Sequence, residues 1–332
     1  MSLHQFVPYW GGGEVAAVHD LLTNSDYLNE HRIVRTFEKE FAKKVGARYC
    51  VAVTSGTVAL YCAIKSASMK GKVRVPTHDG IFAFNALVAA GVSPIVSDVN
   101  EHGVLDVRSD EQAIVVHANG RVAAGVPVIE DCSQATSYHT QGRISTYSFA
   151  STKHITTGGQ GGAICCDDEE TFDALVRLKD HGRTDRQNLR AMSDSYDMWG
   201  LNFKLTEMQA AFGLVQLRSL ERRMRRLDEM YSIYRDVIGD AASFDDVEPR
   251  WYVDIFTPDA AAVAVRLRSA GIGCRPYPRP LHMQGVSSGY DRDQSFPNAE
   301  KRHDTGLYLP STTDLSDEDV KRAAHAVVSA IS

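Results

Sequence analysis

The sequence predicts an α/β protein with a mostly parallel sheet sandwiched by helices, followed by a smaller C-terminal α+β domain. Three observations support this prediction. The 332 residues are enough for roughly two domains. Short apolar runs alternate with helical periodicity as far as residue 166, a pattern typical of βαβ units whose sheet is covered on both faces. After residue 205 the pattern changes to one long helix and then to a few shorter elements.

The elements of the first part follow from their residue patterns. Residues 31–45 are expected to form an amphipathic helix, because four apolar residues recur there at helical spacing: Ile33, Phe37, Phe41 and Val45. Two further helices are expected over residues 57–68 and 81–90. The short apolar runs between helices are expected to be strands, at 49–53, 72–75, 94–98, 113–117, 126–130, 146–150 and 163–166.

The second part begins with one long helix. Residues 205–235 contain many Leu, Met, Ala, Glu and Arg residues and no proline, which favours an uninterrupted helix. Its arginines alternate with acidic residues, so we interpret them as a solvated helix face and not as a nucleic-acid-binding patch. Four elements follow: a strand (251–256), a helix (259–270), a proline-rich loop (276–280) and a final helix from residue 316. The expected domains are a large one, 1–235, and a small C-terminal one, 236–332.

The composition argues against several classes of protein. Hydrophobic residues make up 43% of the chain, too many for a disordered protein. A formal net charge of −6 without a basic block argues against nucleic acid as a partner. No apolar run approaches the roughly 18 residues of a membrane span, and the N-terminus lacks a signal-peptide pattern. The six cysteines are not spaced as zinc ligands, so we expect no metal and a reducing, cytoplasmic location.

Three loops carry chemistry, and each follows a predicted strand, where open parallel sheets bind their ligands. The first is Thr54-Ser-Gly-Thr57. Its small residues let backbone N–H groups approach an anion, and Gly56 and Thr57 lie at the positive end of the following helix. The same residues are also typical of an ordinary helix cap, and this loop alone leaves both interpretations open.

The second loop follows the predicted strand at 126–130. Glu130 and Asp131 form an acidic pair at its end, where a carboxylate is costly unless it meets a partner. Asp131 is placed to hold the protonated ring nitrogen of a pyridine cofactor. A helix-capping aspartate is the alternative that the residue pattern leaves open.

The third loop runs from Thr146 to Gly162 and contains Lys153, followed by Thr-Thr and a cluster of glycines. A lysine that apolar neighbours keep from water has a lowered pKa and becomes a nucleophilic amine, as Schiff-base chemistry requires. Any single lysine is otherwise most often a solvated surface group. A phosphate-binding turn, a carboxylate for a ring nitrogen and a Schiff-base lysine are together the parts that hold pyridoxal 5'-phosphate (PLP).

With these residues the chain resembles the DegT/StrS-type sugar aminotransferases, a branch of the fold-type I PLP enzymes. The resemblance covers nearly the whole chain, and its motifs occur in the family's order: Val34–Ala42, Thr54–Leu60, Val75-Pro76, Ile129–Ala135, Ser148-Phe149 with Lys153, His181-Gly182, Gly200–Ala211, Tyr277-Pro278, Pro280–Gln284 and Leu309-Pro310. It implies the fold-type I PLP transferase fold, with the cofactor bound by the large domain.

The resemblance also implies roles for individual residues. Lys153 would be the Schiff-base lysine and the base that moves the proton. Asp131 would pair with the ring nitrogen, and Gln134 would lie near the ring hydroxyl. Three residues would bind the cofactor phosphate: Gly56, Thr57 and Ser148.

Further implications concern the subunit and the substrate. Asn202 would reach the cofactor phosphate from a neighbouring subunit, which implies a homodimer with shared active sites. Tyr277 and His282 would lie near the substrate. The implied activity is transfer of an amino group from glutamate or glutamine to the keto group of a nucleotide-linked deoxysugar or of a cyclitol, as in aminosugar biosynthesis.

Two other functions remain as alternatives. Some relatives are PLP-dependent sugar dehydratases, in which histidine replaces the lysine; the presence of Lys153 favours transamination. A non-catalytic regulatory protein that retains the fold is the third interpretation. The intact Lys153, Asp131 and Ser148 argue against it.

At Gly80 the chain departs from the family, which usually has an aromatic ring there to stack on the cofactor. We hypothesise that His78 or Phe82 supplies the ring instead, after a local shift of the loop that a glycine permits. The alternative is that Phe82 and Phe84 are core residues of the following helix.

Overall fold

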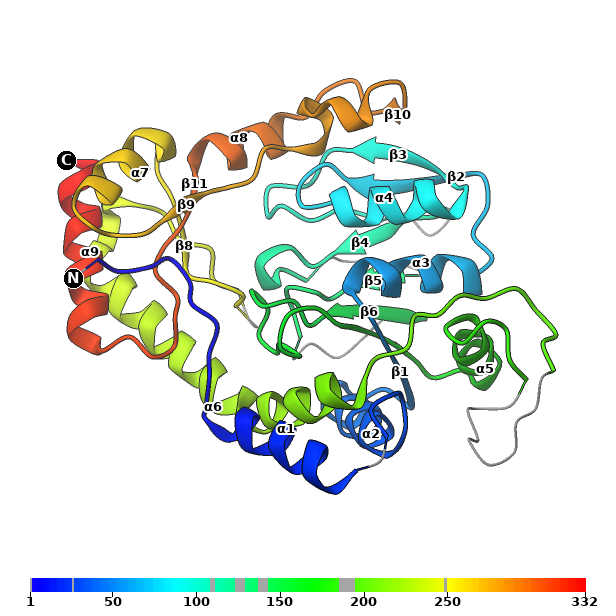
Figure 1. The fold of residues 1–332 in the computed structure, drawn as a ribbon. Coiled ribbons are helices and arrows are strands. Elements are labelled where there is room, and N and C mark those ends of the chain that lie inside the picture. The colour runs from blue at the N-terminus through cyan, green and yellow to red at the C-terminus, as the bar shows by residue number, and fades with distance from the viewer. Residues whose placement is uncertain are drawn as a thin grey trace.

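The computed structural model describes residues 2–25, 27–107, 111–122, 129–136, 143–184, 195–247 and 250–332. It confirms an α/β fold with a mixed, mostly parallel sheet between helices, followed by a smaller α+β part (Figure 1). None of the helices in these ranges is both long and apolar enough to cross a membrane.

The helices and strands have the following bounds. The first part contains Gly13–Asn24 (α1), Arg32–Val45 (α2), Tyr49–Val53 (β1), Gly56–Ser66 (α3), Lys72–Pro76 (β2), Ile81–Ala90 (α4), Ser93–Ser97 (β3), Ile114–Val116 (β4), Ile129–Asp131 (β5), Ile144–Ser148 (β6), Gly162–Cys166 (β7) and Glu169–Leu178 (α5). A long helix, Glu207–Ile238 (α6), follows. The last part contains Asp254–Phe256 (β8), Ala260–Ser269 (α7), Arg275–Pro276 (β9), Asp291–Arg292 (β10), Pro297–Thr305 (α8), Gly306–Tyr308 (β11) and Asp317–Ile331 (α9).

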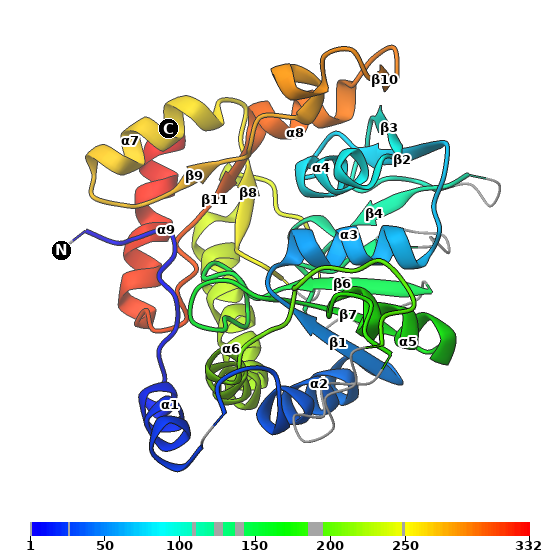
Figure 2. The same cartoon turned by 45° about the vertical axis from the view of Figure 1, so that its right-hand side comes forward.

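The central strands lie side by side in the order β1-β7-β6-β5-β4, and β2 and β3 lie beyond β4 (Figure 2). A bridge between Arg74 and Ala113 joins the two groups. The strand pairs in this sheet are parallel except those of β7, which is antiparallel to both β1 and β6. The carboxyl ends of β1, β2, β4, β5 and β6 therefore lie at one edge, where the loops between strands and helices meet.

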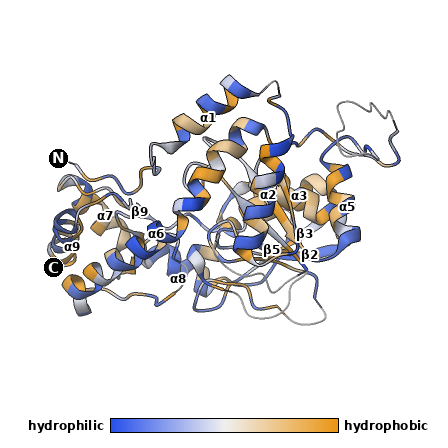
Figure 3. Ribbon diagram, turned by 90° about the horizontal axis from the view of Figure 1, so that it is seen from below, coloured by the Kyte–Doolittle hydropathy of each residue, from blue (hydrophilic) through white to orange (hydrophobic). Residues whose placement is uncertain are grey.

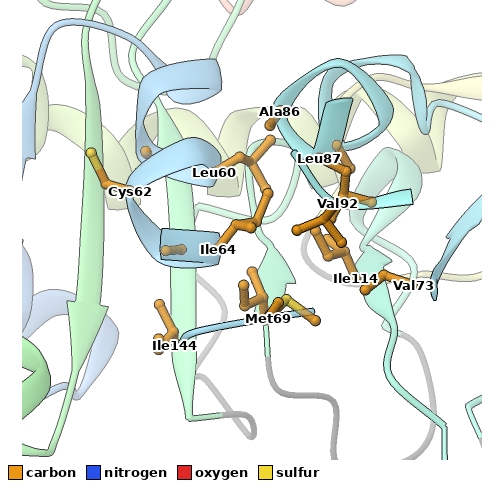
Figure 4. Close-up of a cluster of buried hydrophobic side chains, with 14 of the residues drawn as sticks. Leu60, Cys62, Ile64, Met69, Val73, Ala86, Leu87, Val92, Ile114 and Ile144 are labelled. Carbon is orange, nitrogen blue, oxygen red and sulfur yellow. The ribbon is translucent and has the colours of Figure 1, made fainter. Parts of the chain in front are cut away.

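Helices cover both faces of the sheet. On one face α3, α4 and α5 pack in a core that includes Val51, and Figure 4 shows Leu60 and Ile64 of α3 in that core. On the other face α2 and α6 pack in a core that includes Ala52. Successive residues of β1 therefore point to opposite cores, as the pleat of a strand requires. Both α2 and α6 carry hydrophilic and hydrophobic residues along their length (Figure 3).

The smaller part packs around the second half of α6. Its sheet has the order β8-β11-β9 and is antiparallel. Its core contains α6 residues from Leu227 to Ile238, together with α7, α9 and Leu3 near the N-terminus. The first half of α6 belongs to the core of the large sheet through Ala210 and Leu220. The division into domains 1–235 and 236–332 stays a prediction.

Several elements differ from the sequence pattern. Helix α1 buries only Glu14 and Leu21, so it has no apolar stripe that periodicity could reveal. The strands β9, β10 and β11 have two or three residues each, too few for a recognisable alternation. The sequence predicts a strand that begins at residue 251, but β8 begins at Asp254. Part of the predicted strand at 126–130 lies outside the described residues, and the rest belongs to β5.

A buried glutamate joins α2 to α6. The carboxylate of Glu207, at the start of α6, accepts the N–H groups of His31, Ile33 and Val34 at 2.9, 2.8 and 2.8 Å. The first N–H groups of a helix have no partner within the helix, and His31 provides no side-chain cap for α2. Glu207 therefore takes the place of a local cap and fixes the angle between the two helices on this face of the sheet.

We expect Glu207→Ala to lower the free energy of unfolding by about 2–4 kcal/mol, because three N–H groups lose a charged acceptor. Urea unfolding followed by circular dichroism measures the change. The control is Glu221→Ala, which removes an exposed carboxylate of the same helix that pairs with Lys44. This control should lose much less, because solvent screens an exposed ion pair. Equal losses in the two variants would contradict the capping role.

Candidate active site

The first and third loops of the sequence analysis meet at the carboxyl ends of β1 and β6. The Oγ of Ser55 accepts the N–H of Val58 at 3.2 Å and caps α3, so that Gly56 and Thr57 lie in the first turn of the helix. A Cβ at Gly56 would lie only 2.7 Å from the Cβ of Ser148, at the end of β6. Glycine is therefore required for this close approach. It brings the positive end of the α3 dipole to the Ser148 hydroxyl, an arrangement typical of anion sites.

Asp131 is the last residue of β5 and Gln134 follows three residues later, and both are buried. One carboxylate oxygen of Asp131 accepts the N–H of Ser133 at 3.0 Å, two residues on, as in an Asx turn. The side-chain oxygen of Gln134 accepts the backbone N–H of Asn119. A buried carboxylate at this edge of the sheet stabilises a positive charge placed beside it, such as a protonated ring nitrogen.

Lys153 lies in the loop after β6, with its Nζ 4.4 Å from the centroid of the Trp251 ring. The residue keeps some exposed surface, but burial of its amine lowers the pKa to about 8. The carboxylates of Asp131 and Asp79 act in the opposite direction and favour the charged form, while Arg275 acts with burial. The net result is an amine that is partly neutral near physiological pH.

Lys179, which is buried, shows what an ion pair would change. The Nζ of Lys179 lies 2.9 Å from Glu30 and 3.0 Å from Glu38, and these carboxylates raise its pKa despite burial. In the part of the chain that the structure describes, Lys153 has no carboxylate within ion-pair distance. Lys179 is thus a permanent cation, whereas Lys153 has the properties of a nucleophile.

The loop of Lys153 is held by residues that sequence reasoning missed. The indole N–H of Trp251 and the hydroxyl of Tyr252 both donate to the carbonyl of Thr152, at 3.0 and 2.9 Å. The backbone N–H of Tyr252 in turn donates to the side chain of Asn119 at 3.1 Å. The aromatic pair at 251–252 is visible in the sequence, but nothing in its spacing points to a loop about 100 positions earlier.

Tyr277 belongs to an aromatic cluster that consists of Trp251, Tyr252, Tyr277 and Tyr308. Its ring is stacked between those of His78 and Tyr308, with centroids 5.2 and 4.6 Å away. Its hydroxyl donates to Asp254, and burial raises the pKa of Tyr277. The predicted substrate residue is thus fixed by protein partners on both faces and at its hydroxyl.

His282 and Asn202 are placed by other contacts. The Nδ1 of His282 lies 2.7 Å from the hydroxyl of Thr77, which follows β2, so His282 reaches the carboxyl edge of the sheet. Its ring is stacked on Phe296 with centroids 3.9 Å apart. Asn202 is exposed and forms a backbone bridge with Asp180. An exposed position is what a residue needs to act on a second subunit.

The structure gives a different reason for a glycine at position 80 from the one that the sequence suggests. Its φ of −79° is ordinary, so the position does not use the freedom of a glycine. A Cβ there would lie 1.8 Å from the carbonyl oxygen of Pro76, so it is close packing that excludes a side chain. The left-handed conformation belongs to Asp79, with φ 55°.

The aromatic residues near Gly80 divide into three environments. Phe84 is buried in the core, as the alternative reading expected. His78 is buried against Tyr277, and Phe82 is 50% exposed. The hypothesis that His78 or Phe82 stacks on the cofactor stays a prediction.

The structure brings together one cluster of possible metal ligands that the spacing of residues in the sequence does not predict. His117, Glu130 and Cys132 are buried and bring one ligand atom each within 4.8 Å of one another. The Nε2 of His117 lies 2.8 Å from the carboxylate of Glu130, so these two groups satisfy each other by a hydrogen bond. We assign this cluster to the packing behind Asp131.

Comparison with known proteins gives a family model that matches residues 11–328: the DegT/DnrJ/EryC1/StrS aminotransferase family. The chain is similar to a GDP-perosamine synthase of Escherichia coli O157:H7, with 29% identity over 95% of this chain and 94% of that protein. It is also similar to the spore coat polysaccharide biosynthesis protein SpsC of Bacillus subtilis, with 29% identity over 98% of this chain and 97% of that protein.

Solved structures resemble the whole chain. The aminotransferase TlmJ of Streptoalloteichus hindustanus matches with a TM-score of 0.89 and 24% identity, over 99% of this chain and 98% of that one. Helicobacter pylori PseC, an aminotransferase involved in the biosynthesis of pseudoaminic acid, matches with a TM-score of 0.88 and 20% identity, over 100% and 99%. At this identity the likeness is one of fold.

We expect Lys153 to react with amine-directed reagents at a lower pH than other lysines. With its pKa at about 8, about half of its amines are neutral at pH 8, against less than about 1% for an ordinary lysine. Brief acetylation at several pH values, followed by peptide mass spectrometry, measures the rate at each site. Exposed Lys301 is the control for an ordinary amine. A half-maximal rate for Lys153 above about pH 10 would contradict the lowered pKa.

Proposed function

Because the chain belongs to the DegT/DnrJ/EryC1/StrS aminotransferase family, we propose that it uses PLP to move an amino group from glutamate or glutamine to the keto group of a nucleotide-linked deoxysugar. A keto-cyclitol is the second class of acceptor. The observation that carries the proposal is the Lys153 amine, which lies near Asp131 and whose pKa burial lowers to about 8. Such an amine is both a nucleophile and a proton carrier near neutral pH.

The residues present fit this cofactor. Gly56, Thr57 and Ser148 would bind its phosphate, and a Cβ at Gly56 would fill the approach to Ser148. Asp131 would hold the protonated ring nitrogen, and Gln134 would lie near the ring hydroxyl. When bound, PLP withdraws electrons from the carbon that carries the transferred amino group.

The proton transfers would belong to Lys153. An amine with a pKa near 8 exists in both forms around neutral pH, so it would accept a proton from the carbon bonded to the transferred nitrogen and return it to the carbon on the other side of that nitrogen, a 1,3-proton shift. The bonds from Trp251 and Tyr252 to the Thr152 carbonyl would keep the amine in place between these transfers. The ring of Trp251 would exclude water and preserve the lowered pKa.

The name of one relative supports a sugar as the acceptor, because the Escherichia coli protein is a GDP-perosamine synthase. Tyr277 and His282 would lie near this acceptor, Tyr277 through its place in the aromatic cluster and His282 through Thr77 after β2. A dehydratase is the less favoured alternative, because there a histidine takes the place of the lysine. Here His154 is only the neighbour of Lys153, and burial lowers its pKa to about 4.

We further propose a homodimer with shared active sites. Asn202 would bind the cofactor phosphate of the partner subunit, for which its exposed position is suitable. The large apolar side chains exposed nearby include Met198, Trp199 and Leu201, and a second copy of the chain would cover them.

Replacement of the lysine tests the proposed activity. We expect Lys153→Ala to bind PLP but to lose amino transfer from glutamate by at least about a thousandfold, because no base remains to move the proton. Cofactor absorbance during a single half-reaction measures the rate, and Lys301→Ala is the control for loss of an exposed lysine. Transfer at the wild-type rate by Lys153→Ala would overturn the proposal.

Mixing of two inactive variants tests the shared site. When Lys153→Ala chains exchange with Asn202→Ala chains, a heterodimer has one site with both residues intact. We expect recovery of about a quarter of the wild-type activity at equal amounts and random exchange. The rate of amino transfer after mixing is the measurement, with subunit exchange verified by native mass spectrometry. No recovery despite exchange, or an active monomer, would contradict the shared site.

A further inference from the structure

We propose that Arg275 binds a carboxylate of the amino-acid donor. This inference rests on the proposed function and assigns a binding residue for one of its two substrates. It concerns a side chain that is not among the predicted site residues.

Arg275 and Lys153 lie over the same aromatic ring. The guanidinium carbon of Arg275 is 5.9 Å from the centroid of Trp251, and the Lys153 Nζ is 4.4 Å from it. The guanidinium also lies 5.0 Å from the ring centroid of Tyr308. Two cationic groups therefore contact the Trp251 ring, and the charge of Arg275 acts on the Lys153 amine.

The backbone of Arg275 is fixed although its side chain is exposed. Arg275 lies in β9 and pairs with Tyr308 of β11. A guanidinium that rests on aromatic rings keeps the edge of its planar fork free for hydrogen bonds. Arg275 is thus presented by a strand and by two rings, not by a flexible loop.

Arg275 differs from the other arginines around the cluster in its ion pairing. Arg121 pairs with Asp254 at 2.6 Å, and Arg302 pairs with Asp245 at 2.6 Å. Within the described residues, no carboxylate lies within 4 Å of the Arg275 guanidinium. The structure therefore leaves one guanidinium beside the nucleophile for an anion that arrives with a ligand.

The chemistry of the donor fits this position better than that of the acceptor. The amino group of the donor must bind close to the Lys153 amine. The carboxylates of the donor are only a few bonds away from that amino group. The phosphates of a nucleotide-linked sugar are separated from the reacting carbon by the sugar ring. A carboxylate also matches the planar fork of arginine in a bidentate pair.

Binding of a dicarboxylate that cannot react tests the inference. We expect glutarate to bind the PLP-loaded wild-type protein. In Arg275→Gln the dissociation constant of glutarate should rise by about tenfold or more. Isothermal titration calorimetry measures binding without any turnover. Arg279→Gln is the matched control, because it removes the same charge from an exposed position in the same segment. Arg275→Lys should recover part of the affinity, since it keeps the charge but not the fork.

A second probe, GDP, distinguishes a phosphate from a carboxylate. Loss of glutarate affinity in Arg275→Gln, with GDP binding and the Arg279→Gln variant unchanged, supports the inference. Unchanged glutarate affinity, a loss confined to GDP, or no saturable binding of glutarate to the wild type would overturn it. Failure of the proposed function is seen separately, as amino transfer that persists in Lys153→Ala.

Discussion

The proposed active site depends on the burial of one amine without a matching anion. A lysine ammonium in the interior costs several kcal/mol unless a carboxylate lies beside it. At Lys179 the chain meets this cost in the usual way, with Glu30 and Glu38 in direct contact. At Lys153 the neighbour is the Trp251 ring, and the amine responds by releasing its proton more easily. The reactivity that we propose for Lys153 thus follows from the lack, among the described residues, of a carboxylate within ion-pair distance of its amine.

The same constraint joins the two parts of the molecule. Trp251 and Tyr252 come after α6, yet they bind the Thr152 carbonyl in the loop of the large sheet. Nearby, Arg121 of the first part forms a buried ion pair with Asp254 of β8. Separation of the parts would leave Arg121 without its carboxylates and Asp254 without its cation, which is strongly unfavourable in a buried site. The aromatic cluster is therefore held over Lys153 by polar contacts as well as by packing.

Sequence periodicity is sufficient for the elements that bury an apolar stripe. The predicted helices at 31–45 and 81–90 and the strand at 49–53 agree with α2, α4 and β1 within one residue. The family motifs predict a role for Lys153 and the loops around it, because the chemistry proposed there requires particular residues at short spacing; that role stays a prediction. They do not identify the contacts of Trp251 or the cap provided by Glu207, since each joins positions more than 90 residues apart. The apolar residues of β7 also do not predict its antiparallel direction, because the direction of a strand depends on how the chain connects it to its neighbours and not on its composition.

Helix α6 has a consequence for any attempt to divide the protein. Its first half completes the core behind the large sheet, and its second half supplies one side of the core in the smaller part. A chain cut at residue 235 would therefore end with Leu227, Met230, Tyr231 and Tyr234 uncovered on a helix that is otherwise intact. An apolar surface of this kind promotes association with other chains. Helix α6 thus belongs to the core behind the large sheet and to the core of the smaller part, so a cut within it would expose apolar surface.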